Sequence, residues 1–300
     1  MSARSQSPEA ERRASFLAQV AELRPPLHRY CARLMGSVID GEDVVQDTLA
    51  RALTSLHELA EPAALRAWLF RIAHNRALDL LRGRALRDAQ PIEAAEKLDD
   101  PTTPDPVETI MRHEAINTAI SRFTELPTVQ RSVVILKDVL GEPLADIAQL
   151  LGLSVDAVKA HLARGRTRLR EINARSVSLQ AYAPSEAVVR YVTLFNRHDW
   201  TGLRALLADD VKLVQSSHAP RSGAADVSMF FSGYAKIDGV RLAPAWLEGR
   251  EVIAVFDRAH DPKPGYFMWL EWRDDRIVFI RDYRYDRYVA QDAELVVASS

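Results

Sequence analysis

The stretch PLADIAQLLGLSVDAVKAHLARGRTRLR, Pro143–Arg170, decides the fold of the middle of the chain. Its first apolar residues recur at spacings of three and four, which predicts a short amphipathic helix. Gly152 then permits a tight turn, and Ser154 is a residue type that accepts the first free N–H groups of a following helix. The pattern therefore predicts a helix-turn-helix whose second helix could enter the major groove of DNA.

The second helix of this motif leaves polar and basic positions outside its apolar stripe. The stripe consists of Val158, Leu162 and Leu169. Among the positions outside it we predict DNA contacts at Ser154, Val155, Asp156, Lys159, Arg164 and Arg166. Arg168 is a further exposed or lateral position of this helix. A plain helical hairpin is the alternative, and the basic second helix favours DNA binding over it.

The composition limits the class of protein. A chain of 300 residues suits two or three domains, and a hydrophobic content of 47% excludes a mainly disordered chain. The single cysteine, Cys31, excludes an internal disulfide and a cysteine-rich zinc site, and we expect it to be buried. We predict no metal, no cofactor and no enzymatic activity for the main function. The lack of a long apolar run and of a secretory signal predicts a cytoplasmic protein with no membrane contact.

Charge is sorted into blocks along the first half of the chain. Residues 1–175 carry 24 basic and 24 acidic residues, so their sum is zero. Arginines dominate residues 66–87 and 159–175, whereas residues 88–108 carry seven acids against Lys97. Two basic helical stretches on either side of an acidic segment indicate two contacts with a polyanion. Ordinary charged helix surfaces are the alternative.

The chain reads as a multidomain protein. Helical periodicity fills two segments, and a proline-rich acidic stretch that cannot build a core separates them. The predicted divisions are a disordered N-terminus at 1–15, a helical domain at 16–87, an acidic linker at 88–107, the helix-turn-helix domain at 108–173, a second linker at 174–184 and an α+β domain at 185–300.

The last domain begins with helical patterns and continues with strand-like patterns. Helices are predicted at 185–197 and 199–208. Strand-like runs follow at 211–215, 240–246, 252–256, 266–272 and 277–288. Turn residues between these runs predict hairpins, and therefore a curved antiparallel sheet covered by helices.

Two further motifs complete a family pattern. They are DGEDVVQDTLARAL, Asp40–Leu53, with Asp40 as the predicted N-cap, and RAWLFRIAHNRALDLLRGR, Arg66–Arg84. Together with ELPTVQRSVVILKDVLGEPLADIAQLLGLS they resemble the extracytoplasmic-function (ECF) class of bacterial RNA polymerase sigma factors, over roughly residues 16–172. The resemblance implies a region 2 helical domain and a region 4 helix-turn-helix domain. Such a protein binds core RNA polymerase, recognises the −35 and −10 promoter elements, melts DNA and starts transcription.

The resemblance also implies roles for individual residues. The set expected on the clamp helices of the polymerase β′ subunit is Asp43, Gln46 and Asp47. The set expected at the −10 element is Leu59, Trp68, Arg71, Asn75 and Arg82, and the helix-turn-helix residues would hold the −35 element. Trp68 could stack on a base, with packing in the core as the alternative, and His74 is expected at the surface.

The stretch SEAVVRYVTLFNRHDWTGLRALLADDVKLV, Ser185–Val214, resembles the start of SnoaL-like domains, which have the nuclear-transport-factor-two-like fold. That resemblance implies a cone-shaped cavity. Its expected lining is His218, Trp246, Trp269, Asp282 and Tyr283. The glycine-rich DGGGK-type motif of one such sigma group is missing; Ser232–Val240 is the nearest stretch.

We expect the C-terminal domain to contact the sigma domains and to modulate their activity, with a small-molecule ligand as a further partner. Two alternatives remain. The chain could be a ligand-responsive helix-turn-helix transcription factor, or its C-terminal domain could be an isomerase or hydrolase acting on a small molecule.

Overall fold

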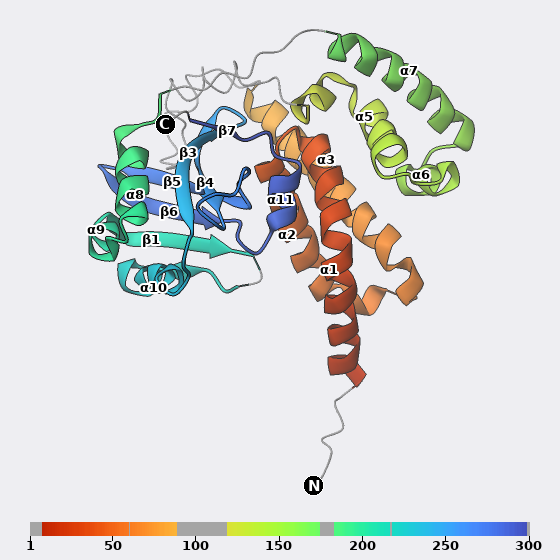
Figure 1. Cartoon of the computed structure of the whole chain (residues 1–300). Helices are drawn as coiled ribbons and strands as arrows, with labels where there is room; N and C mark the ends of the chain where they lie inside the picture. The colour runs from red at the N-terminus through yellow and green to blue at the C-terminus, as the bar shows by residue number, and fades with distance from the viewer. Residues whose placement is uncertain (1–7, 60, 89–118, 175–182, 217, 299–300) are drawn as a thin grey trace. The chain divides into compact units, whose positions relative to one another are not determined.

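The computed structural model describes residues 8–59, 61–88, 119–174, 183–216 and 218–298 (Figure 1). The chain forms two compact units. The first joins the N-terminal helical domain to the helix-turn-helix domain, and the second contains the C-terminal α+β domain. Most of the predicted linker at 88–107 and most of that at 174–184 lie outside the described residues.

The N-terminal helical domain contains three long helices: α1 (Pro8–Met35), α2 (Val38–Thr54) and α3 (Leu65–Asp88). Two short 3₁₀ turns, η1 (Leu56–Glu58) and η2 (Pro62–Ala64), connect α2 to α3. Helix α1 begins at Pro8, whereas the sequence predicted a domain start at residue 16. It also runs through Pro25 and Pro26 without a break.

Helix α2 begins earlier than its sequence pattern predicted. Ser37, and not Asp40, is the N-cap, because the Ser37 side chain accepts a hydrogen bond from the Asp40 backbone N–H at 3.2 Å. Asp40 instead lies in the first turn, where a carboxylate complements the helix dipole. Buried apolar residues of α1, α2 and α3, Cys31 among them, form the core of this domain.

The helix-turn-helix domain begins, in the described part of the chain, with η4 (Ser121–Glu125) and α5 (Thr128–Val134). A π-helical turn, η5 (Ile135–Val139), leads to α6 (Leu144–Leu151) and the long α7 (Val155–Asn173). Gly152 ends α6 in the left-handed conformation at φ 67°. Ser154 caps α7 by accepting a hydrogen bond from the Ala157 N–H at 3.1 Å. The predicted helix-turn-helix is therefore present.

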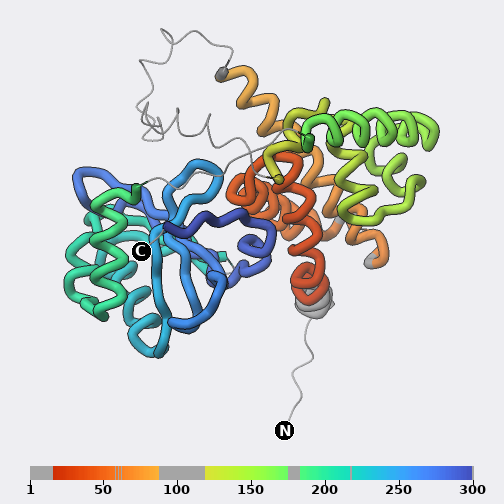
Figure 2. Tube along the Cα trace, turned by 45° about the horizontal axis from the view of Figure 1, so that its top comes forward, coloured from red at the N-terminus to blue at the C-terminus, as the bar shows by residue number. Residues whose placement is uncertain are grey.

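A single apolar cluster runs through both helical domains. It includes Leu27 and Tyr30 from α1 together with Leu126, Leu136 and Ile147 from the helix-turn-helix domain. Helix α1 contacts η4, α5 and η5, and helix α3 contacts α6. Figure 2 traces these helices, red to orange for α1–α3 and yellow to green for α5–α7. The two helical domains thus share one core.

The C-terminal domain packs helices on one face of a seven-stranded sheet. Helices α8 (Glu186–Asn196), α9 (Trp200–Ala205) and α10 (Ala224–Tyr234) cover that face (Figure 1). The strands are β1 (Leu207–Gln215), β2 (Arg221–Ser222), β3 (Arg241–Leu247), β4 (Arg250–Phe256), β5 (Tyr266–Arg273), β6 (Arg276–Asp282) and β7 (Val296–Val297). Their order in the sheet is β2-β1-β6-β5-β4-β3-β7.

This architecture is the α+β architecture expected for the C-terminal domain, and several of its elements differ from the predicted ones. The sheet is not wholly antiparallel, because β1 pairs in parallel with β6. The run at 277–288 is not one strand: β6 ends at Asp282, and α11 (Arg287–Gln291) follows. Helix α10 was not predicted, since AADVSMFFSGY is apolar on several sides and shows little helical periodicity.

No helix among the described residues is long and apolar enough to span a membrane.

Candidate nucleic-acid interface

Helix α3 carries one polar face formed by predicted −10 residues. Successive residues of a helix turn by about 100°, so Arg71, Asn75 and Arg82 fall within about 40° of one another. All three side chains are exposed. Arg82 donates a hydrogen bond to Asp79 at 2.7 Å, one turn away on the same surface. The structure therefore brings three of the five predicted residues together on one face.

The other two predicted −10 residues lie differently. Trp68 and Leu59 are half-buried and pack against the apolar cluster of the helical domains. His74, expected at the surface, is also half-buried, and its Nδ1 lies 2.7 Å from the Tyr30 hydroxyl. Burial lowers the pKa of His74, which favours the neutral imidazole.

Two of the three α2 residues predicted to contact the polymerase form hydrogen bonds with neighbouring side chains. Asp47 forms an ion pair with Arg76 of α3, with Arg76 Nε donating to Asp47 Oδ2 at 2.8 Å. Gln46 donates to the buried Glu42 at 2.6 Å, and Asp43 is exposed. Asp43 and Asp47 of this predicted set therefore both present exposed side chains, and that of Asp47 is 47% exposed although it is paired with Arg76.

One flank of α7 carries cations that are already paired with acids. Lys159 donates to Asp156 at 3.1 Å. Arg166 makes two hydrogen bonds to Asp138 of η5, at 2.9 and 2.5 Å. The hydrogen bond to Asp138 raises the pKa of Arg166, so this side chain stays charged. Val155 is exposed at the start of this flank, and Ser154 serves as the N-cap.

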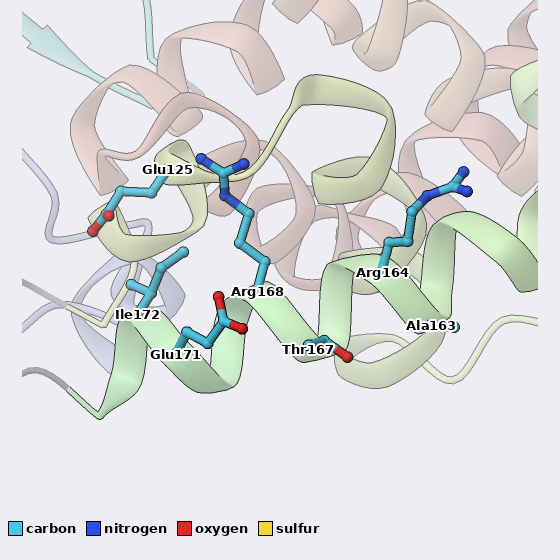
Figure 3. Close-up of a pocket in the computed structure, with 7 residues that line it drawn as sticks. All are labelled: Glu125, Ala163, Arg164, Thr167, Arg168, Glu171 and Ile172. Carbon is cyan, nitrogen blue, oxygen red and sulfur yellow. The ribbon is translucent and has the colours of Figure 1, made fainter.

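The opposite flank of α7 holds a groove of about 510 Å³. Arg164 and Arg168 lie about 40° apart around the helix and about 170° from the Lys159–Arg166 flank. Figure 3 shows both arginines extending to the same side of α7. The groove is lined by Glu125, Ala163, Arg164, Thr167, Arg168, Glu171 and Ile172.

The two flanks of α7 suit a helix that lies in a groove of DNA. Cations on both sides of the helix can each face one phosphate strand, and the exposed ridge between them can face base edges. The sequence reasoning grouped these cations as one set and missed Thr167, which lies between the flanks. A count of about 100° per residue from Ser154 would have separated the two flanks and found Thr167.

The structure places the predicted cavity residues of the C-terminal domain in different parts of that domain. His218 is exposed, and its ring stacks on that of Tyr285 with the ring centroids 4.3 Å apart. Tyr283 packs on Phe267, and Trp269 contacts Phe279. Side chains alternate between the two faces along a strand, and Tyr266 and Met268 of β5 belong to the apolar cluster under the helices. Phe267 and Trp269 therefore point away from the helix-covered face. Trp246 lies near the end of β3, outside the apolar cluster.

Asp282 lies on the helix-covered face, inside a buried polar cluster. Its carboxylate accepts hydrogen bonds from Gln215 Nε2 at 2.8 Å and from the Arg284 N–H at 3.1 Å. The Tyr234 hydroxyl lies 3.4 Å from Asp282 and 2.7 Å from the Tyr266 hydroxyl. Burial raises the pKa of Asp282 to about 6, against the opposing effect of these donors.

Tyr191 of α8 belongs to the same region. Its ring is fully buried, and its hydroxyl has no hydrogen-bond partner in the part of the chain that the structure describes. Burial, together with the charge of Asp282, raises the pKa of Tyr191. Three phenols and one carboxyl group therefore meet inside this domain. Within the described residues, no group of three His, Cys, Asp or Glu side chains could hold a metal ion.

A helical domain with one arginine–asparagine face, joined to a helix-turn-helix with two basic flanks, defines a multidomain DNA-binding protein. Residues 19–87 match the Sigma-70 region 2 family, and residues 119–169 match the Sigma-70, region 4 family. The chain belongs to the ECF RNA polymerase sigma factors.

Two relatives show the extent of the likeness. The ECF sigma factor SigM of Mycobacterium tuberculosis is 33% identical over 146 residues, which are 49% of this chain and 70% of SigM. SigG of the same species is 32% identical over 217 residues, or 64% of this chain, and the chain spans 59% of the length of SigG. The match to the crystal structure of the M. tuberculosis extracytoplasmic function sigma factor SigJ covers 89% of this chain and 95% of the SigJ chain. The sequence identity is 21% and the TM-score is 0.36.

Proposed function

We propose that this protein is a promoter-recognition subunit of bacterial RNA polymerase that acts in the cytoplasm without a cofactor. The observation that carries the proposal is the pair of exposed basic helix faces, one on α3 and one on α7, in a chain of the sigma family. In this proposal α3 engages the −10 element, α7 the −35 element, and α2 the clamp helices of the β′ subunit.

The chemistry of promoter opening suits the residues on α3. Unpairing and extruding a base costs a few kcal/mol, which contacts to the separated strand offset. Arg71 and Arg82 can neutralise phosphates, and Asn75 between them can read a base edge. Leu59 would form one wall for the extruded base. We assign Trp68 to supporting the helix, since its ring is half-buried against the core.

The core-binding part of the proposal has a direct test. The triple variant D43A/Q46A/D47A should bind core polymerase about tenfold more weakly, a loss that a few interfacial contacts commonly carry. D226A/D238A in the C-terminal domain is the matched control, because both acids are exposed there. Equal core binding by the triple variant and the control would remove α2 from the interface.

We further propose that the C-terminal domain modulates the sigma domains by contacting them. The support is that it forms a separate compact unit on the same chain. Removal of residues 180–300 should change the rate of transcription from a cognate promoter in either direction. Transcription that stays the same, with the truncated protein expressed at the level of the full chain, would argue against a modulating role.

A second candidate function concerns the C-terminal domain alone. The buried cluster of Asp282, Tyr234 and Tyr266 could bind or protonate a small molecule, as isomerases and hydrolases do. Small molecules can be screened for those that raise the thermal unfolding temperature of the parent protein. A compound that stabilises the parent but not D282N/Y234F would support this candidate. A ligand-responsive transcription factor would instead act on promoters without binding core polymerase, so co-purification with the core separates the alternatives.

A further inference from the structure

We propose that Arg76 is a further DNA-binding residue of α3, which Asp47 holds in the free protein and releases when core polymerase binds Asp47. The inference rests on the proposed function, because it takes Asp47 to lie on the surface of α2 that meets the β′ clamp helices. It makes DNA binding by α3 depend on core binding by α2. The hold of Asp47 on Arg76 can be tested in the free protein, without polymerase.

The ion pair that joins α2 to α3 is covered unequally on its two sides. Arg76 Nε donates to Asp47 Oδ2 at 2.8 Å, and Arg76 Nη2 lies 2.6 Å from the same oxygen. The side chain of Asp47 is 47% exposed, whereas that of Arg76 is 26% exposed. The acid of the pair is therefore open to a partner, while the cation is held against α2.

Arg76 lies at the edge of the α3 surface that carries Arg71, Asn75 and Arg82. It follows Asn75 directly in the chain and lies about 100° from it around the helix. Phosphate contacts position a protein on DNA beside the groups that read bases, and a guanidinium can bind a phosphate through two N–H groups. Once it is released from Asp47, the guanidinium of Arg76 can therefore bind the backbone of the strand that Asn75 faces.

A cation of the clamp helices would compete with Arg76 for the carboxylate of Asp47. Both contacts of Arg76 use the same oxygen, Oδ2. A second cation brought to this carboxylate attracts the acid and repels the guanidinium of Arg76. An ion pair with this degree of exposure is weak, so it can exchange its partner readily. Core binding at Asp47 would therefore set Arg76 free at the edge of the −10 surface.

The exchange leaves α2 packed on α3. Arg84 of α3 donates to Asp40 Oδ2 of α2 at 3.0 Å, and apolar residues of both helices lie in one core. Only the side chain of Arg76 therefore has to move, and the coupling between the two sites is reciprocal. Core binding at Asp47 raises the affinity of α3 for DNA, and DNA that takes Arg76 raises the affinity of α2 for the core by the same factor.

A double-mutant cycle in the free full-length protein tests the hold of Asp47 on Arg76. D47N removes the charge of the acid and should raise the affinity for a fluorescent poly(dT) oligonucleotide about threefold at low salt, as expected for the loss of one partly exposed ion pair. In the R76Q background D47N should have only the small effect that E22Q, which neutralises an exposed acid of α1, has in the parent. An equal gain in both backgrounds, or no gain in the parent, would overturn the hold.

Core polymerase provides a second arm in which R76Q has two effects of opposite sign. R76Q leaves Asp47 without this cation, so it should bind core about threefold more tightly than the parent. The holoenzyme that it forms should bind the separated −10 strand of a cognate promoter about threefold more weakly, with the salt slope lowered by about 0.7 for one lost phosphate contact. R190Q, on α8 of the other unit, is the matched control and should change neither. A structural role of Arg76 would weaken both kinds of binding, and that result, or unchanged DNA binding by the R76Q holoenzyme, would overturn the release.

The two arms distinguish a failure of the exchange from a failure of the proposed function. If no variant bound core polymerase, the parent included, the proposed function and the release would both be refuted, and a gain by D47N on poly(dT) would still support the hold of Asp47 on Arg76. If the parent bound core and initiated at a promoter while the cycle showed no coupling between Asp47 and Arg76, the proposed function would stand and the exchange would be refuted.

Discussion

Two glycines of the N-terminal domain differ in how closely a neighbouring helix approaches them. Gly41 lies inside α2, where glycine normally costs helix stability. A Cβ at Gly41 would lie 2.5 Å from the Cα and N atoms of Ala32 in α1, so the backbones of the two helices touch there. A Cβ at Gly83 in α3 would meet no other atom within 4 Å, so that side of the helix has room for a methyl group.

These two glycines make a matched pair of substitutions. G41A should destabilise the helical domain by about 1–3 kcal/mol, because α1 and α2 must separate. G83A should stabilise it by up to about 1 kcal/mol, through the better helix propensity of alanine. Hydrogen–deuterium exchange at α1 and α2 measures both effects, and equal exchange in the two variants would contradict the packing at Gly41.

The buried carboxyl group of Asp282 gives the C-terminal domain a pH-dependent contribution to its stability. The pKa of Asp282 is raised from 3.8 to about 6 in the folded chain. The folded state therefore holds this proton more tightly than the unfolded state does. The resulting stability is fully present below pH ~4 and is lost as the pH rises to about 6, with a change on the order of 3 kcal/mol.

The variant D282N should remove this pH dependence, because the amide does not ionise. Urea unfolding followed by tryptophan fluorescence is suitable, since four of the five tryptophans (Trp200, Trp246, Trp269 and Trp272) lie in this domain. Between pH 4 and pH 7 the parent should lose stability and D282N should lose much less. Parallel curves would show that Asp282 does not control the titration.

At the scale of the element, α7 is expected to contact both phosphate strands through its two flanks. Replacing Arg164 and Arg168 by glutamine should weaken binding to any duplex DNA and lower the slope of log affinity against log salt by about one per arginine. R190Q, on α8 of the other unit, is the control with the same type of charge change. A slope unchanged in R164Q/R168Q would take this flank of α7 out of the interface.

Elements with one strong period were predictable from the sequence. Helices α6 and α7 have regular apolar stripes, and glycine or serine at their ends marks the turn. Helix α10 and the end of β6 were not predictable in the same way. FF and YRYDRY place apolar and polar side chains on several sides at once, and tertiary packing decides their conformation.

The candidate site divides along similar lines. The exposed face of α3 follows from helical spacing alone, so Arg71, Asn75 and Arg82 could be grouped in advance. The partners Asp138 for Arg166 and Asp47 for Arg76 are 28 and 29 residues away, and only the fold brings them together. The Asp282 cluster draws on β1, α10, β5 and β6, so sequence spacing could not reveal it.

At the scale of the molecule, the shared core of the two helical domains departs most from the sequence-based expectation. An acidic segment between two helical patterns predicted independent domains joined by a tether. The described residues instead form a continuous apolar cluster, with Arg131 bonded to a carbonyl 97 residues earlier.

Run-off transcription with bacterial core polymerase on a genomic fragment library tests the central claim most directly. The parent chain should direct initiation at discrete sites that core polymerase alone does not use, R190Q should retain this activity, and R71A/N75A should lose most of it. If the chain bound fragments but gave no initiation with core polymerase, or if R71A/N75A initiated as well as the parent, the account of α3 as a promoter-opening surface would be contradicted.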